Sequence, residues 1–183
     1  MSVLPRALYR NNIASKLDAI RKHYVKLSGR GIIHGLMCVD QDAKVIAVDQ
    51  FFDKNLNVWD LSALGAAMFG VSKQGMECFG ADNLERSAMV YGNMQFFVKS
   101  IGNFELDNRG SRELLILVLS DRKVNLGLMI LQMQRYGKVI KDEVKANQEI
   151  KSTLKLSETE MRAHIKEIKK QLFKQAKSMN ATL

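Results

Sequence analysis

The feature that most constrains the fold is a helix-forming segment without a charged face, residues 58–79. Between positions 58 and 74 the only charged side chains are Asp60 and Lys73. Large apolar side chains lie on one side of the helix, and mostly small ones lie on the other. The first set is Leu61, Leu64, Met68, Val71 and Phe79, and the second is Trp59, Ala63, Ala66 and Gly70. Because a helix that is apolar all round must be covered on both sides, we expect this one to have two packing partners. Its small residues let another backbone approach closely, although each glycine inside the helix costs about 1 kcal/mol in helix propensity.

The preceding segment predicts a helix and a hairpin. Asn11 or Asn12 can cap a helix that ends at Gly29. Apolar residues recur along it at spacings of three and four, as one helix face requires. These residues are Ile13, Leu17, Ile20, Tyr24 and Leu27. Residues 31–40 and 43–50 then predict two strands around a polar turn at positions 40–42.

Three more strands are expected after residue 79. Residues 85–92 and 94–102 are joined at Gly92-Asn93, a hairpin signal because glycine tolerates the positive φ of a two-residue turn. A polar loop is expected at 103–112. The apolar run 112–119 predicts a fifth strand inside the sheet. Asp121 is a candidate cap for the helix that follows.

That helix carries two apolar stripes, one of which stops at Arg135 while the other continues. The short stripe is Val124, Gly127, Leu128 and Leu131, and the long one is Leu126, Met129, Met133, Tyr136, Ile140 and Val144. We therefore expect the first half of the helix to be covered on two sides, with Gly127 where helix and strand approach most closely. A helix break is expected within 145–156. The capping box Ser157-x-x-Glu160 then begins a basic helix that extends to about residue 179.

The order of elements is helix, two strands, helix, three strands, helix, and an extra C-terminal helix. The fold class is α+β, with helices packed on a five-stranded antiparallel sheet. The third strand, 84–91, pairs only with its hairpin partner and leaves an open edge, which soluble proteins must cover. A bare edge beside a helix that is apolar on both sides points to a second copy of the chain, since a twofold axis covers both surfaces with the same patch.

Composition is compatible with one globular domain and about one extra element. The chain has 183 residues, 46% of them hydrophobic, and no window reaches the ~20 apolar residues of a membrane-spanning helix. Its start has no apolar signal-peptide core, so we expect a cytoplasmic protein. Cys38 and Cys78 form no disulfide framework. The net charge of +9 lies on the flanks, because residues 1–30 carry +6, residues 151–183 carry +5 and the middle carries −2.

Several segments, in this order and spacing, resemble the roadblock/dynein light chain superfamily, which includes bacterial and archaeal regulators of Ras-like GTPases and Ragulator-type scaffold subunits. They are DAKVIAVDQ, LSALGAAMFGVSKQG, MVYGNMQFFVKSIG, ELLILVLS and NLGLMIL. The last, directly after the fifth strand, is the most specific. The chain departs from the short form of the family in its basic C-terminal helix and in a first hairpin turn, Asp-Gln-Asp-Ala, where a glycine is common.

The resemblance implies a roadblock-like domain at residues 10–149, which leaves residues 150–183 as a basic amphipathic C-terminal helical extension outside the family pattern. It implies a homodimer, or a heterodimer with another roadblock-like chain, in which the second helices pack together and the third strands join the two sheets. It also implies a non-enzymatic regulator or scaffold that binds a Ras-like small GTPase. The expected dimer interface is Trp59, Leu61, Ala63, Leu64, Ala66, Ala67, Met68, Gly70, Val71, Met89 and Tyr91.

Residues that carry catalysis in other proteins form no recognisable pattern here. The histidines, His23, His34 and His164, lie on three different predicted elements, so no zinc site is expected. There is no phosphate-binding loop signature, and no cofactor is expected. Asp40 and Asp42 flank a hairpin tip, where aspartates more often form the turn than hold a cation. Cys38 lies four residues after His34 in a strand, which is a weak indication of a nucleophile pair.

The alternative function is a membrane-surface or nucleic-acid-associated module that acts through the basic flanks. Lysines 166, 169, 170, 174 and 177 lie opposite or beside the apolar stripe of the last helix. Interfacial helices have this pattern, although tryptophan is absent and Phe173 is alone. No aromatic residues alternate with the lysines to stack on bases. We favour a last helix that packs on the body of the protein.

Overall fold

The computed structural model describes residues 6–105 and 110–155. Its elements are α1 (Arg6–Tyr9), α2 (Asn12–Ser28), β1 (Ile33–Asp40), β2 (Val45–Val48), α3 (Val58–Phe79), β3 (Arg86–Tyr91), β4 (Met94–Glu105), β5 (Ser111–Asp121), α4 (Leu126–Ala146) and α5 (Gln148–Lys155). The five strands form one antiparallel sheet in the order β2-β1-β5-β4-β3. The predicted fold class, α+β with helices packed on a five-stranded antiparallel sheet, is confirmed.

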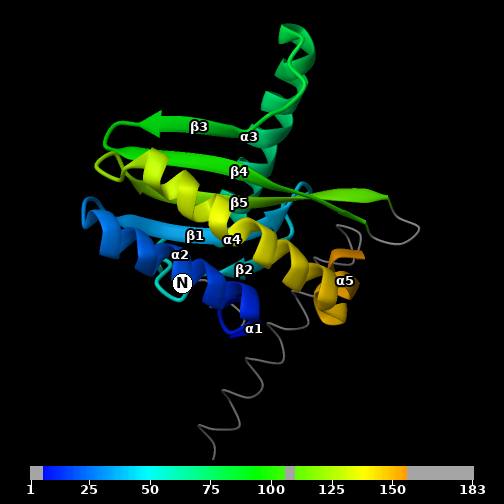
Figure 1. Cartoon of the computed structure of the whole chain (residues 1–183), viewed down its shortest axis with the longest axis horizontal. Helices are drawn as coiled ribbons and strands as arrows, with labels where there is room; N and C mark the ends of the chain where they lie inside the picture. The colour runs from blue at the N-terminus through cyan, green and yellow to red at the C-terminus, as the bar shows by residue number, and fades with distance from the viewer. Residues whose placement is uncertain (1–5, 106–109, 156–183) are drawn as a thin grey trace, which may run out of the picture.

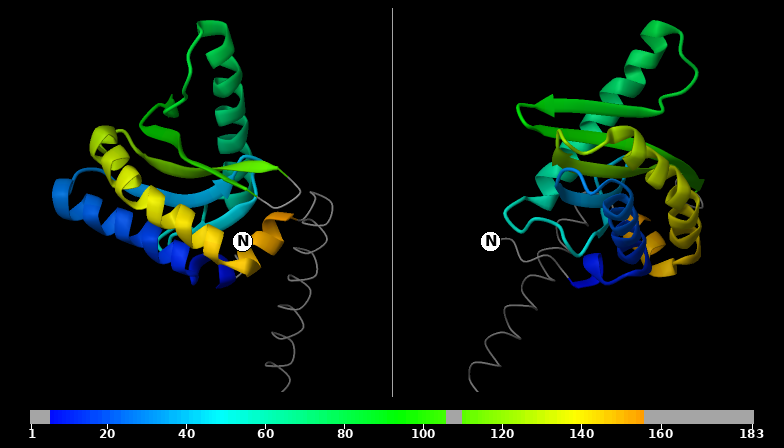
Figure 2. Two further views of the ribbon diagram at one scale, coloured as in Figure 1. Left: turned by 45° about the vertical axis from the view of Figure 1, so that its right-hand side comes forward. Right: turned by 60° about the vertical axis from the view of Figure 1, so that its left-hand side comes forward.

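The sheet separates two layers of helix (Figure 1). α2 and α4 lie side by side on one face, and α3 crosses the other (Figures 1 and 2). Each face has its own core cluster. Leu36, Phe97 and Ile116 belong to the cluster under α2 and α4, whereas Phe96 and Leu117 belong to the cluster under α3.

Local chemistry places α2 as the sequence predicts. The Asn11 side chain accepts a hydrogen bond from the Ala14 amide at 2.8 Å, and its own amide donates to the Ile46 carbonyl on β2 at 3.0 Å. Gly29 ends the helix with a φ of 59°. Tyr24 is buried with the rest of the predicted stripe, but Leu27 is exposed and was wrongly included.

α4 corrects two further predictions. Its cap is Asn125, whose side chain accepts from the Leu128 amide at 3.0 Å, whereas Asp121 still belongs to β5. Gly127 is exposed on the short stripe, and a Cβ there would meet nothing closer than 3.5 Å. The close approach is instead at Gly137, where a Cβ would lie 2.9 Å from Cγ2 of Ile101 on β4. α4 therefore packs beside α2 mainly through the buried residues of the long stripe, together with Ile130 and Gly137.

The loop predicted at 103–112 is shorter than expected. β4 continues to Glu105 and β5 begins at Ser111, so the two strands form a long hairpin. Their register shifts between Ser100 and Gly102, and Gly102 has a φ of 99°. A bulge at this position thus allows β4 and β5 to stay paired among the polar residues that predict a loop.

The helix break predicted within 145–156 lies at Asn147, between α4 and α5. α5 crosses the predicted domain boundary at 149/150, and its Leu154 is buried in the core cluster under α2 and α4. The basic helix predicted from Ser157 lies outside the described residues. No helix within residues 6–105 and 110–155 has the length and apolar character needed to cross a membrane.

Candidate interaction surface

α3 meets the sheet through a narrow stripe of mostly small residues. The Asn57 side chain caps the helix by accepting from the Trp59 amide at 3.1 Å, and Gly80 ends it in the left-handed conformation. The buried residues of the helix are Val58, Ser62, Gly65, Ala66 and Phe69. At Gly65 the helix lies so close to the sheet that a Cβ would be 2.1 Å from Cδ2 of Leu117 and 3.3 Å from Cζ of Phe96. Hence the sheet-facing stripe is neither of the two faces predicted from sequence.

The opposite side of α3 is apolar, and no other segment among residues 6–105 and 110–155 covers it. Ala63, Leu64, Ala67 and Gly70 are exposed, Val71 is 69% exposed and Phe79 is 87% exposed. A Cβ on Gly70 would meet no atom of the described residues within 4 Å, so packing within this part of the chain does not require a glycine there. The last turns of α3 extend beyond β3, away from the rest of the described chain (Figures 1 and 2).

β3 continues this apolar surface along the sheet edge. Among the described residues it is the terminal strand of the sheet and pairs only with β4, as predicted. Met89 pairs with Phe96 of the α3-side cluster, so Met89 and Tyr91 lie on the same sheet face as α3. Ala88 and Val90 point to the other face, and all four side chains are exposed. The outer backbone edge of β3 therefore offers unpaired hydrogen-bonding groups beside an apolar helix.

The structure brings most of the expected interface residues into this one region. Leu64, Val71, Met89 and Tyr91 are exposed with the small residues of α3, and Trp59, Leu61 and Met68 are half-buried at the edge of the α3-side core. Ala66 differs, because it is only 9% exposed and lies in the stripe that faces the sheet. We define the α3/β3 surface as Ala63, Leu64, Ala67, Gly70, Val71, Phe79, Met89 and Tyr91 on the α3 side, with Val90 on the other face of the same open strand edge.

Two members of this surface, Phe79 and Val90, are absent from the interface expected from sequence. Val90 could have been found. Residues 88–91 are all apolar and do not alternate with polar residues, which indicates a strand covered on both faces. Phe79 could not have been assigned to this surface, because the sequence does not tell how far the helix extends past the sheet.

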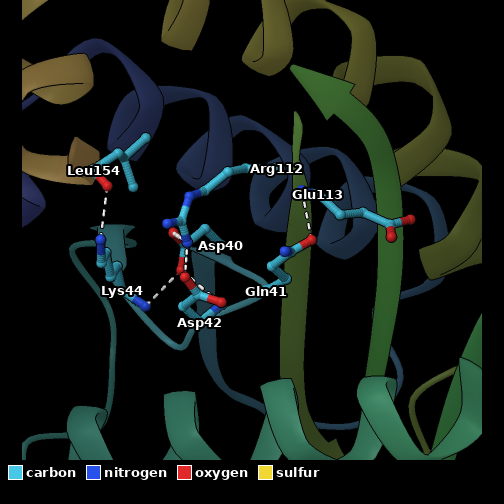
Figure 3. A network of polar contacts seen from close by, with 7 residues as sticks. All are labelled: Asp40, Gln41, Asp42, Lys44, Arg112, Glu113 and Leu154. Atoms are coloured by element: carbon cyan, nitrogen blue, oxygen red, sulfur yellow. Dashed lines mark hydrogen bonds and ion pairs between the residues drawn. The ribbon is translucent and has the colours of Figure 1, made fainter. Parts of the chain in front are cut away.

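The hairpin tip with Asp40 and Asp42 is a structural turn (Figure 3). The buried Asp40 carboxylate accepts from the amides of Asp42 at 3.0 Å and Lys44 at 2.8 Å. Arg112 of β5 forms ion pairs with both aspartates. Burial raises the pKa of Asp40, while the Lys44 amide and the Arg112 charge oppose the shift. Arg112 therefore occupies the place where a cation would neutralise these carboxylates.

Two further contacts tie this hairpin to its neighbours (Figure 3). The Glu113 amide donates to the Gln41 side chain at 3.1 Å, which holds the turn to β5. The Lys44 ammonium donates to the Leu154 carbonyl at 2.7 Å, which fastens α5 to the hairpin. The polar groups at the tip are therefore used in joining elements of the fold.

The other reactive groups also have structural roles. Cys38 lies fully buried, and burial, together with the charge of Asp40, raises its pKa to about 12, so it is no nucleophile at neutral pH. A ring nitrogen of His23 lies 2.8 Å from the Tyr136 hydroxyl, which joins α2 to α4. Within the described residues, no group of three or more His, Cys, Asp or Glu side chains is placed to hold a metal ion.

Solved structures match this fold where sequence comparison does not. No protein-family model matches the chain, and no curated protein is significantly similar to it. The gliding protein MglB from Thermus thermophilus superposes with a TM-score of 0.57 at 14% identity, covering 79% of this chain and 100% of that one. MglB of Myxococcus xanthus gives 0.56 at 13% identity, covering 75% and 98%. A roadblock/LC7 domain from Streptomyces avermitilis gives 0.55 at 15% identity, covering 70% and 98%. The chain thus has the roadblock/LC7 fold.

Proposed function

We propose that this chain, with its roadblock/LC7 fold, is a non-enzymatic dimeric platform that binds and regulates, or scaffolds, a Ras-like small GTPase. The observation that carries the proposal is the uncovered α3/β3 surface. Val71 and Phe79 are the most exposed of its large side chains, and they lie beside the open edge of β3. Monomeric proteins rarely leave a contiguous apolar patch of this kind next to an unpaired strand.

A second roadblock-like subunit is the partner that this surface fits best. Under a twofold axis, α3 packs on α3 of the partner while the two β3 strands pair. The same patch on each subunit then covers both the apolar side of α3 and the open edge of β3. Gly70 supports this arrangement, because an exposed glycine inside a helix costs stability unless another backbone comes close. An identical chain gives a homodimer and a related chain a heterodimer. A solved MglB structure of similar fold, with a TM-score of 0.57, is itself tetrameric.

The GTPase part of the proposal follows from the likeness to MglB and roadblock proteins and from the resemblance of the sequence segments. Ras-like GTPases dock on such dimers, and the platform changes their nucleotide turnover or only positions them. We assign the platform to residues 10–149. The packing of Leu154 and the bond from Lys44 extend the folded unit to the end of α5.

The dimer is tested by charge substitutions on α3. Gly70→Arg and Val71→Arg place a cation on the uncovered face and should leave the fold intact, because neither position packs inside the chain. Ala66→Arg is unsuitable since it would disturb the sheet contact. The matched control is Leu131→Arg, a 60% exposed position on α4, on the opposite side of the sheet. Sedimentation velocity should give monomers for both α3 variants and dimers for wild type and control. Dimers that persist in both α3 variants would contradict the interface.

Docking is tested with purified small GTPases from the same genome, each loaded with GDP or with a non-hydrolysable GTP analogue. We expect complex formation with at least one of them, a changed hydrolysis rate if the platform regulates turnover, and weaker binding by Gly70→Arg than by Leu131→Arg. Absence of binding to every candidate in both nucleotide states would refute the GTPase assignment. That result would not bear on the proposed dimer, because sedimentation velocity tests the dimer separately.

A further inference from the structure

A second exposed surface lies at one end of the sheet, where three connections meet. They are residues 29–32 after α2, the β3–β4 turn at 92–93, and residues 121–125 before α4 (left side of Figure 1). Backbone hydrogen bonds join them, from Asp121 to the Ile32 carbonyl at 2.9 Å and from Arg122 to the Asn93 carbonyl at 2.8 Å. The Tyr24 hydroxyl further donates to the Arg30 carbonyl and accepts from the Asn125 amide. The three connections therefore form a rigid unit.

Three exposed cations lie on this unit. Arg30, Arg122 and Lys123 are exposed, and none of them has an ion pair with any residue in the described part of the chain. Asp121, the acidic residue of this unit, is held by the backbone, because its two oxygens accept from the Ile32 and Lys123 amides at 3.0 Å each. The positive end of the α4 dipole adds to the same field.

Apolar side chains lie among these cations. Leu27 is 62% exposed and Ile32 is 61% exposed, although neither is needed for the core. Leu27, Val124 and Leu128 line an open hollow of about 450 Å³ together with Arg30, Arg122 and Lys123, and no acidic side chain of the described residues lines it. The end surface, defined as Leu27, Arg30, Ile32, Arg122, Lys123 and Leu128, thus combines an open hollow with exposed aliphatic side chains and three cations.

We propose that the end surface binds an acidic protein segment, inserting an apolar side chain of that segment into the hollow while its carboxylates meet Arg30, Arg122 and Lys123. The charges are complementary, and arginine forks match carboxylates in geometry. A protruding side chain fills a hollow, whereas the plane of lipid headgroups does not, and this favours a protein ligand over an anionic membrane. The proposal is independent of the GTPase assignment and of the α3/β3 surface.

The test measures fluorescence anisotropy of a labelled synthetic peptide of glutamates and leucines on addition of the full chain. The matched peptide has glutamine in place of each glutamate. The surface variant is Arg30→Glu/Arg122→Glu/Lys123→Glu. The control variant, Lys22→Glu/Lys54→Glu/Lys138→Glu, makes the same change in net charge at exposed positions elsewhere. Circular dichroism verifies that both variants fold.

We expect the acidic peptide to bind in a salt-sensitive manner, and the surface variant and the glutamine peptide each to lose about tenfold or more in affinity. The control variant should stay within about twofold of wild type. Leu27→Ser should weaken binding without changing its salt dependence. Equal losses in both triple variants, or no binding of the acidic peptide, would overturn the proposal. So would binding to phosphatidylserine vesicles that the surface variant abolishes while the peptide does not bind.

Discussion

Two glycines of α3 allow the packing of this helix to be tested with one type of substitution. Gly65 and Gly70 are both inside the helix, so changing either to alanine gains about 1 kcal/mol of helix propensity. Their surroundings differ. A Cβ at Gly65 would lie 2.1 Å from Cδ2 and 2.8 Å from Cγ of the buried Leu117, whereas a Cβ at Gly70 would meet nothing within 4 Å.

The magnitudes follow from these distances. Gly70→Ala should raise the free energy of unfolding of the subunit by about 1 kcal/mol, which is a rise in melting temperature of about 2–4 °C for a chain of this size. Gly65→Ala must displace Leu117 or the helix, and overpacking of this kind costs about 1–3 kcal/mol, or more where backbone has to shift. The propensity gain offsets part of that cost. We expect Gly65→Ala to be less stable than wild type and the two variants to differ by about 1–3 kcal/mol.

Urea denaturation followed by circular dichroism measures both free energies, with the slope of the transition checking that each variant unfolds like wild type. Measurements at several protein concentrations separate the subunit from the assembly, because Gly70→Ala would also space two packed α3 helices apart and reduce the concentration-dependent part of the stability. If the Gly65→Ala variant were as stable as the Gly70→Ala variant at the lowest protein concentration, the close contact between α3 and the sheet would be refuted.

Three further predictions concern individual side chains. The thiol reagent DTNB at pH 8 should modify one cysteine of the folded chain, the exposed Cys78, because a pKa of about 12 leaves only about one in ten thousand Cys38 groups as thiolate; two fast-reacting thiols would contradict this burial. Arg21→Met removes the ion pair to the buried Asp49, 2.5 Å between Nε and Oδ2, and should cost about 3–5 kcal/mol at pH 7. Burial already raises the pKa of Asp49 and Arg21 opposes this, so without Arg21 the carboxylate takes up a proton more readily and the cost, measured by urea denaturation, should shrink as the pH falls towards 4. Asn125→Ala should lower the free energy of unfolding by about 1 kcal/mol through loss of the bond to the Leu128 amide, and Asn125→Asp should retain most of it.

Much of the fold could be predicted from short-range signals. Asn11 and Gly29 delimit α2, Gly92-Asn93 forms the β3–β4 turn, and the apolar run within 112–119 lies centrally in the sheet. These predictions depend on interactions between residues a few positions apart, whose chemistry follows from the residue types themselves. Where a contact depends on an element that is distant in the sequence, the residue types do not tell which of two similar positions makes that contact.

The glycines illustrate this limit. Gly127 was predicted to contact a strand and is exposed, while Gly137, ten positions later, contacts Ile101. Nothing in the residue types distinguishes them, because a glycine in a helix indicates a close neighbour without saying which neighbour. The long β4–β5 hairpin was missed for a related reason. Within it the exposed Asn103 and Glu105 alternate with Phe104, which is buried in the core cluster under α2 and α4, so the polar residues that predict a loop lie on the opposite face of the strand from that cluster.

The candidate surface raises the same question at the level of the whole helix. A helix that is apolar on every side, such as α3, is expected to pack against two partners. The sequence pattern places its large residues toward one partner and its small residues toward the other. The structure uses a third stripe, centred on Gly65, for the sheet and leaves Gly70 and Val71 outside. Since Gly65 already provides the close contact that the sheet requires, Gly70 has no internal reason to lack a side chain. The position of that second glycine, on the same side as an open strand edge, is therefore the strongest argument within a single chain for a neighbouring subunit.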